Sequence, residues 1–138
     1  MPRKKEQEIS EHLQALRHIV PNLPPLEEII RVKTDSYIEY DVGGDIECYD
    51  EKLLVNDEIT VSHWFCGAGG IFPDHVHQSD EWFILYEGRA TLYLAGEAMP
   101  TRLGKMTFIP LGVAHSFRVG KDTYGIFISM PPADGFPS

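Results

Sequence analysis

Hydrophobic and polar residues alternate along most of the chain after residue 35, which is the pattern of half-buried β-strands. Glycine and proline turn signals separate these stretches at intervals of roughly eight to twelve residues, and Gly43-Gly44 and Gly88 are expected to close hairpins. Many short strands of this kind predict an all-β fold, either a sandwich or a barrel. The expected strands are residues 36–42, 46–49, 59–66, 81–86, 89–94, 105–109, 115–119 and 124–130, with a histidine-containing strand after Pro73.

The first part of the chain follows a different pattern. We expect a short amphipathic helix over residues 6–20, because apolar side chains recur there at steps of four, three and four residues. Pro21 ends this helix and begins a proline-rich connection. Residues 1–34 are therefore interpreted as a helical arm, and residues 35–138 as a single barrel domain.

Histidine and glutamate side chains occur at metal-ligand spacing within the predicted strands. His75 and His77 alternate on an extended strand, so both side chains point to the same face. The polar stretch Gln78-Ser79-Asp80 is long enough to turn the chain and bring Glu81 back beside them. Two imidazoles and a carboxylate that converge suit a divalent transition metal. His115, at the start of a later alternating strand, offers a fourth ligand.

These residues lie in two motifs that resemble those of the cupin superfamily, whose members are small antiparallel β-barrels with a metal in the lumen. The first motif, G-x5-H-x-H-x3-4-E-x6-G, is matched by Gly69, His75, His77, Glu81 and Gly88. The second motif, G-x5-P-x-G-x2-H-x3-N, is matched by Gly104, Pro110, Gly112 and His115, but Val119 replaces its final Asn. The resemblance implies a cupin-type jelly-roll, or double-stranded β-barrel, domain. It also implies one divalent transition metal per chain, Fe, Mn, Ni, Zn or Cu, held by His75, His77, Glu81 and His115.

The alternation of the strands predicts what surrounds the metal. Side chains that share a face with the ligands are apolar, so the lumen is expected to be mainly apolar. These side chains are Phe83, Leu85, Ala90, Leu92, Leu94, Phe117 and Val119. The opposite face of the Glu81 strand is also apolar, with Trp82, Ile84 and Tyr86. Either the N-terminal arm or a second subunit has to cover that face, and we predict a homodimer.

The candidate catalytic residues are Glu81, His63 and Tyr124. Glu81 is a ligand that is also able to act as a base. If the apolar face of its strand points inward, His63 reaches the lumen and contacts the substrate or a ligand; otherwise it is a hydrogen-bonded core residue. Tyr124 is the third candidate, because it alternates with the apolar residues Ile126 and Ile128 and its hydroxyl would then point into the lumen. Asp74 and Asp80 flank the ligands and are interpreted as turn formers or outward charges.

Composition narrows the range of partners. The 138 residues carry a formal net charge of −9, and residues 27–58 hold eleven of the acidic side chains, interpreted as a solvated face. Such a surface repels phosphate backbones, so nucleic acid is an unexpected partner. No apolar run is long enough to span a membrane, and no secretory signal is found. We therefore expect a cytoplasmic protein in which Cys48 and Cys66 are free thiols.

Three functions fit these observations. The first is a metal-dependent enzyme that acts on a small oxygenated molecule, for which the cupin resemblance implies a dioxygenase, or an isomerase or decarboxylase. The second is a non-catalytic module that binds a small ligand, favoured by an apolar lumen with few acid–base groups. The third is a metal-free structural role, as in storage cupins, which are long, secreted and built of two barrels.

Overall fold

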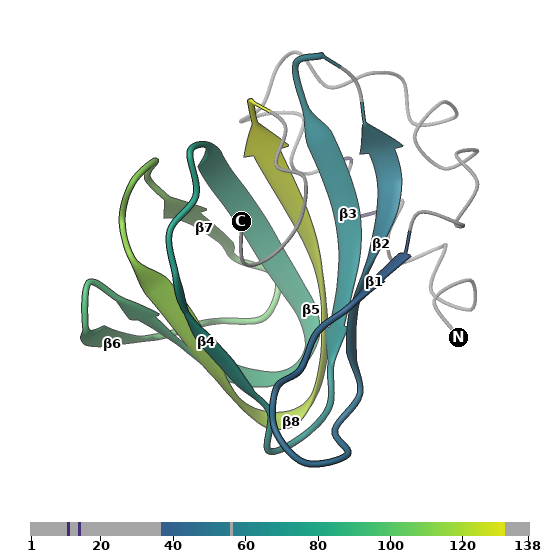
Figure 1. The fold of residues 1–138 in the computed structure, drawn as a ribbon, viewed down its shortest axis with the longest axis vertical. Helices are drawn as coiled ribbons and strands as arrows, with labels where there is room; N and C mark the ends of the chain where they lie inside the picture. Colours follow the sequence, from purple (N-terminus) through teal and green to yellow (C-terminus); the bar gives the residue numbers. More distant parts are fainter. Residues whose placement is uncertain (1–10, 12–13, 15–36, 56, 132–138) are drawn as a thin grey trace.

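The computed structural model describes residues 11, 14, 37–55 and 57–131. Residues 37–55 and 57–131 form antiparallel β-strands joined by turns, so the all-β prediction is confirmed (Figure 1). Within the described part of the chain, no helix has the length and apolar character needed to cross a membrane. The predicted helix over residues 6–20 lies largely outside the described residues. The strands are β1 (Tyr37–Glu39), β2 (Cys48–Val55), β3 (Thr60–Cys66), β4 (Ile71–His75), β5 (Asp80–Leu94), β6 (Glu97–Pro100), β7 (Met106–Ile109) and β8 (His115–Met130).

Two long strands, β5 and β8, run through both layers of the fold. The first half of β5 pairs with the second half of β8, and this pair is flanked by β3, β2 and β1 on one side and by β7 on the other. The second half of β5 pairs with the first half of β8, flanked by β6 and β4. The two layers curve around a common interior (Figure 1). This is the predicted double-sheet jelly-roll barrel.

The prediction of a hairpin at Gly88 is wrong. The chain continues through Gly88 as one strand, β5, and both halves of this strand pair with β8. Register shifts between Leu85 and Ala90 bend the strand from one layer into the other. Gly88 has a φ of 103°, and a Cβ there would lie 2.4 Å from the carbonyl oxygen of Asp122, so the bend requires glycine. The two strands predicted for the end of the chain likewise form one strand, β8.

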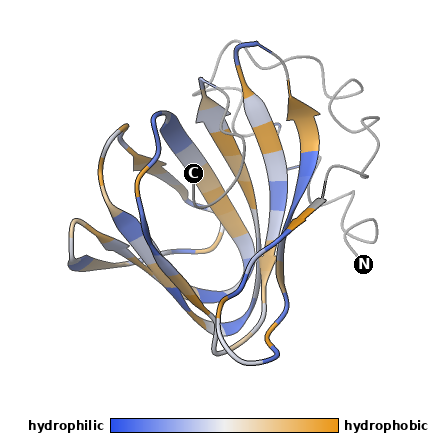
Figure 2. Cartoon of the chain, viewed as in Figure 1, coloured by the Kyte–Doolittle hydropathy of each residue, from blue (hydrophilic) through white to orange (hydrophobic). Residues whose placement is uncertain are grey.

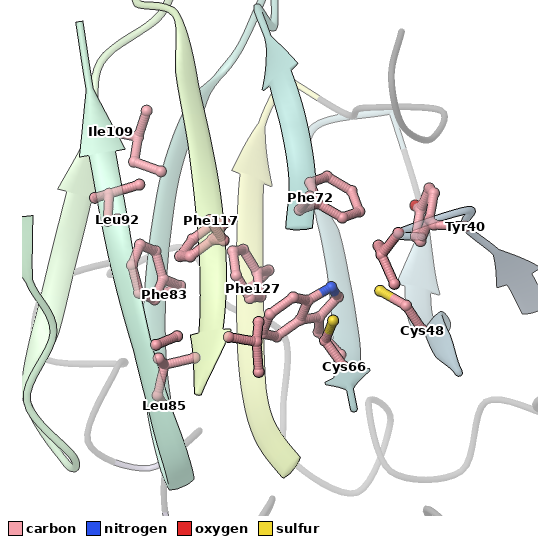
Figure 3. Packing of buried hydrophobic residues seen from close by; sticks show 14 residues of the cluster. Tyr40, Cys48, Cys66, Phe72, Phe83, Leu85, Leu92, Ile109, Phe117 and Phe127 are labelled. Carbon is pink, nitrogen blue, oxygen red and sulfur yellow. The ribbon is translucent and has the colours of Figure 1, made fainter. Parts of the chain in front are cut away.

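The space between the layers, called the lumen below, contains the larger of two buried apolar clusters, called the inner cluster below. Figure 3 shows the rings of Phe83, Phe117 and Phe127 lying together. The ring centroids of Phe83 lie 5.4 Å from Phe117 and 4.9 Å from Phe127, so the two layers are in direct contact. The predicted inward residues are all found here: Phe83, Leu85, Ala90, Leu92, Phe117 and Val119 are buried, and Leu94 packs against them. Cys48 and Cys66 also belong to this cluster, and both are free as predicted.

The second apolar cluster, called the outer cluster below, lies on the other face of the β3–β8–β5 layer. Val61, Ile84, Ile126 and Ile128 are buried in it, and Trp82 packs against it while partly exposed. Figure 2 shows apolar and polar colours succeeding one another along β3. Even so, all seven residues of β3 are buried, because both faces of this strand are covered. The expected apolar outer face is thus present, and the homodimer stays a prediction.

Candidate metal centre

Three histidines and one glutamate converge between the two layers. His75 is the last residue of β4 and His115 the first residue of β8, and the two are register partners. His77 lies two residues beyond β4, and Glu81 is the second residue of β5. All four side chains are buried, with exposed fractions from 1% to 7%. The structure therefore brings together the four residues predicted from the two motifs.

Backbone and side-chain hydrogen bonds join the loop that contains His77 to the turn before His115. The N–H of Gly112 donates to the carbonyl oxygen of His77 at 3.0 Å. The N–H of Leu111 donates to Oδ1 of Asp80 at 2.9 Å. Asp80 was expected to form a turn or to point outward, and here it links the two motif loops. These contacts hold His77 beside His115 although the two are distant in sequence.

Backbone carbonyls set the orientation of two imidazole rings. Nδ1 of His75 lies 2.8 Å from the carbonyl oxygen of Pro73, and Nδ1 of His115 lies 2.9 Å from that of Val113. Because a carbonyl oxygen only accepts, Nδ1 of each ring carries the proton and donates it. Nε2 then holds the available lone pair, as a metal-binding imidazole requires.

The polar atoms lie at distances that one metal ion can bridge. The ligand atoms of His75, His77 and His115 all lie within 4.8 Å of one another. The Glu81 carboxyl oxygens lie 3.7 Å from Nε2 of His115 and 3.9 Å from Nε2 of His77, too far for hydrogen bonds. Ligands that each lie about 2.0–2.2 Å from a shared ion are separated by roughly 3–4 Å. The Ser129 hydroxyl donates to Oε2 of Glu81 at 3.2 Å and so orients this carboxyl.

Burial determines the charge of these groups in the metal-free protein. Desolvation lowers the pKa of His75 to about 4 and that of His77 to about 3, and it lowers the pKa of His115 as well. All three rings are therefore neutral near pH 7. Desolvation raises the pKa of Glu81 to about 8, and the Asp50 charge adds to this effect. Glu81 and His115 thus face each other as neutral groups rather than as an ion pair.

Two buried atoms test whether a metal suits this donor set. Nε2 of His115 and Oε1 of Glu81 have no hydrogen-bond partner among the described residues. Leaving a buried polar atom unsatisfied costs about 1–3 kcal/mol, and a divalent ion would satisfy both lone pairs at once. Three imidazoles and one carboxylate suit Fe, Mn, Ni, Zn or Cu. The three histidines therefore form a candidate metal site, and Glu81 lies where it would complete the site.

The expectation that His63 and Tyr124 reach the lumen is wrong. Both side chains lie on the face of the sheet that carries the outer cluster. Nε2 of His63 lies 2.5 Å from the hydroxyl oxygen of Tyr86, and its ring stacks on Tyr86 and Tyr124 at centroid distances of 5.8 and 5.9 Å. Nδ1 of His63 lies 3.9 Å from Oε1 of Glu51. His63 is therefore the hydrogen-bonded core histidine of the two alternatives, and Tyr124 shares its position outside the lumen.

The expectation of a mainly apolar lumen is incomplete. Lys52 lies opposite Ser62 in the register of β2 and β3, and Ser62 lies opposite Phe127 in the register of β3 and β8. Phe127 belongs to the inner cluster, so all three side chains share the inner face of the layer. Asp50, two residues before Lys52, points to the same face. Both charged side chains are buried, with exposed fractions of 5% for Asp50 and 8% for Lys52. One wall of the lumen therefore carries charge.

Sequence reasoning missed this wall for two reasons. It ended the second strand at Tyr49, whereas β2 continues to Val55. It also assigned the acidic residues of 27–58 to a solvated face, and the structure buries Asp50 and Glu51 among them. One signal was available in the sequence. Cys48 is of a residue type that is typically buried, and in a strand that continues past Tyr49 it shares a face with Asp50 and Lys52.

Comparisons with known proteins agree with this fold. A sequence model of the cupin domain matches residues 63–131, half of the chain, and this range contains both motifs. The uncharacterized protein SCO3923 of Streptomyces coelicolor is 26% identical over 82 residues, which are 59% of this chain and 78% of that protein. An RmlC-like cupin of Shewanella frigidimarina superposes with a TM-score of 0.61 at 19% identity, over 73% of this chain and 89% of that chain. The polyketide cyclase RemF of Streptomyces resistomycificus gives a TM-score of 0.58 at 23% identity, over 73% and 78% of the two chains. The chain belongs to the cupin family.

Proposed function

We propose that this cupin is a metal-dependent enzyme that acts on a small oxygenated molecule bound in the lumen. The observation that supports this most strongly is the convergence of three neutral, buried imidazoles and one buried carboxyl on a common centre. A purely structural barrel gains nothing from leaving Nε2 of His115 and Oε1 of Glu81 without hydrogen bonds among the described residues.

The residues divide the work as follows. His75, His77, His115 and Glu81 would hold one divalent ion, which would act as a Lewis acid toward oxygen atoms of the substrate. Ser129 orients the Glu81 carboxyl through its hydrogen bond. The apolar inner cluster excludes water and so strengthens the electrostatic interactions at the site. Glu81 is the acid–base group nearest to the centre, and it would act as a base by releasing the ion.

The position of the acid–base groups favours one class of reaction. His63 and Tyr124 lie outside the lumen, and the acid–base groups that the described residues place on its inner face include Glu81, Asp50 and Lys52. Chemistry that needs a Lewis acid and a single proton transfer, such as isomerisation or decarboxylation of a keto or hydroxy acid, matches this set. A dioxygenase reaction uses the same ligands. Among proteins with this fold, RemF is an enzyme, a polyketide cyclase.

A turnover assay tests the proposal. Protein loaded separately with Fe(II), Mn(II), Ni(II) or Zn(II) would be incubated with keto acids, hydroxy acids, diketones and catechols, and oxygen uptake and products would be followed. We expect turnover with at least one pair of metal and substrate, and a loss of at least about a hundredfold in H77A. Tight binding of one of these compounds without turnover under any metal would instead identify a non-catalytic ligand-binding module.

A further inference from the structure

Strand β2 presents two charged side chains to the lumen that the metal centre does not use. Asp50 and Lys52 alternate along the inner face of β2, next to β3, and both are at least nine-tenths buried. Charged groups are rarely buried to this degree unless they are paired or have a function. The two residues are called the β2 charge pair below.

The β2 charge pair lies on the same inner face as Glu81 of the metal centre. Glu81 is the register partner of Ser129, and Phe127, two residues before Ser129, is the register partner of Ser62, which lies opposite Lys52. Residues two apart along a strand share a face, so Lys52 lies one cross-strand row from the row of Glu81. A small molecule held at the three histidines would therefore lie against the face that also carries Lys52 and Asp50.

The hydrogen bonds of Asp50 leave one oxygen available. The Tyr40 hydroxyl donates to Oδ2 at 3.4 Å, and the Ser62 hydroxyl also stabilises the carboxylate. Oδ1 of Asp50 has no hydrogen-bond partner among the described residues, although it is fully buried. A buried carboxylate oxygen in this state is an acceptor for a donor that is brought in from outside.

We propose that the β2 charge pair is the specificity-determining wall of the site, and that it selects a small acid that also bears a hydroxyl group. Lys52 binds the anionic carboxylate of this ligand, and Oδ1 of Asp50 accepts a hydrogen bond from its hydroxyl group. The ligand class is thus a hydroxy acid, or a keto acid in its hydrated or enol form. This inference rests on the proposed function, since the same molecule would contact the metal.

The pattern of satisfied and unsatisfied atoms distinguishes this role from a structural one. A buried ion pair that served only stability would have each lone pair matched, because an imperfect buried pair is destabilising. Here the carboxylate receives hydroxyl groups on one side only and leaves Oδ1 open. The charge on this wall is also local: apart from histidines, the buried charged side chains among the described residues are Asp50, Glu51, Lys52 and Glu81, and Glu51 lies beside His63 on the other face.

Ligand binding to the Co(II)-loaded protein tests the assignment, with the visible spectrum of the ion as readout. The probes are lactate, its neutral methyl ester, and propionate, which lacks the hydroxyl group. We expect the wild-type protein to bind lactate more tightly than either of the other two. K52Q should weaken lactate binding by about tenfold to a hundredfold and leave methyl lactate unchanged, because a charge-assisted hydrogen bond is lost. K52R should retain most of the preference for lactate.

D50N and K121Q complete the set of variants. D50N should reduce the preference for lactate over propionate while keeping the preference for lactate over its ester. K121Q removes an exposed lysine from β8 and should bind all three probes like the wild type. Circular dichroism and cobalt content would be recorded for each variant, and K52M replaces K52Q if the latter does not fold.

Two results would overturn the proposal in distinguishable ways. A cobalt-loaded wild type without preference for lactate over methyl lactate, or a folded K52Q or K52M with unchanged lactate affinity, would reject the β2 charge pair and leave the metal centre intact. A wild type that takes up no Co(II) would reject the proposed function, and the specificity wall with it.

Discussion

Replacement of His115 by alanine is expected to lower the affinity for Zn(II) or Co(II) by at least about a hundredfold. Changes to residues that merely orient a metal ligand cost 10- to 100-fold, so removal of a ligand should cost no less. His115 is 1% exposed, its Nδ1 lies against the carbonyl of Val113, and its Nε2 lies 3.7 Å from Glu81. Alanine removes this nitrogen, so Oε1 of Glu81 no longer has a second ligand atom opposite it to share the ion. Competition with a chromophoric chelator measures the affinity.

His63→Gln is the matched control for this substitution. His63 is also a completely buried histidine, but it lies on the opposite face of the same layer, where its Nε2 contacts the Tyr86 hydroxyl. Glutamine keeps a polar group in this position, so H63Q should bind metal like the wild type even if it unfolds more readily. Equal losses of metal affinity in H115A and H63Q would indicate a general loss of structure and would contradict the assignment.

Metal uptake near pH 6.5 is expected to release about one proton per ion, and the apparent affinity should fall roughly tenfold per pH unit below about pH 7. The proton comes from Glu81, because burial raises its pKa to about 8 and only the ionised carboxylate is a good ligand. His75 and His77 do not contribute in this range, since their pKa values lie near 4 and 3 and both rings are already neutral. Metal affinity therefore rises with pH in this range, as expected for a single acid that must lose its proton when the ion binds.

Titration calorimetry in buffers with different ionisation enthalpies measures this proton count. E81Q is the control: it should bind metal more weakly near pH 8, release no proton, and lose the pH dependence between about pH 5.5 and 7. Uptake by the wild type at pH 6.5 without proton release would show that Glu81 is not a ligand. Release of two or more protons would show that histidines are protonated before the ion binds.

The candidate site could be predicted from sequence because its geometry is set by short-range features. His75, His77 and Glu81 lie within seven residues. Glu81 is the second residue of β5, and the strand backbone sets the direction of its carboxyl group. His115 lies on β8, the antiparallel partner of β4, and is the register partner of His75. The spacing of residues does not reveal this contact, but the second motif identified His115 as a ligand. Asp80 was the exception, since its bond to Leu111 depends on the meeting of two loops.

The bend at Gly88 could not be predicted, because hairpin turns and strand bends place the same demands on a residue. Both need glycine at positive φ, and Gly88 has a φ of 103°. The difference lies in pairing partners far along the chain: both halves of β5 pair with β8 rather than with each other. Local sequence contains no information about that choice.

The prediction that His63 reaches the lumen failed for a related reason. Its alternation with Val61 was correctly identified, but both faces of β3 are buried, so an apolar face did not show which side was the lumen. Lys52 was not predicted to lie in a strand, and a charged side chain is usually exposed, so the sequence did not mark it as a residue of the lumen. In both cases the deciding factor is what lies across the sheet, which only the assembled barrel shows.

The X-ray absorption spectrum of the zinc-loaded protein tests the central claim most directly, because it reports the ligand atoms themselves. We predict a shell of nitrogen and oxygen donors at about 2.0–2.2 Å with the outer scattering of three imidazoles, and the loss of one imidazole contribution in H115A. A sulfur shell near about 2.3 Å, or a spectrum without imidazole scattering, would contradict a centre built from His75, His77, His115 and Glu81.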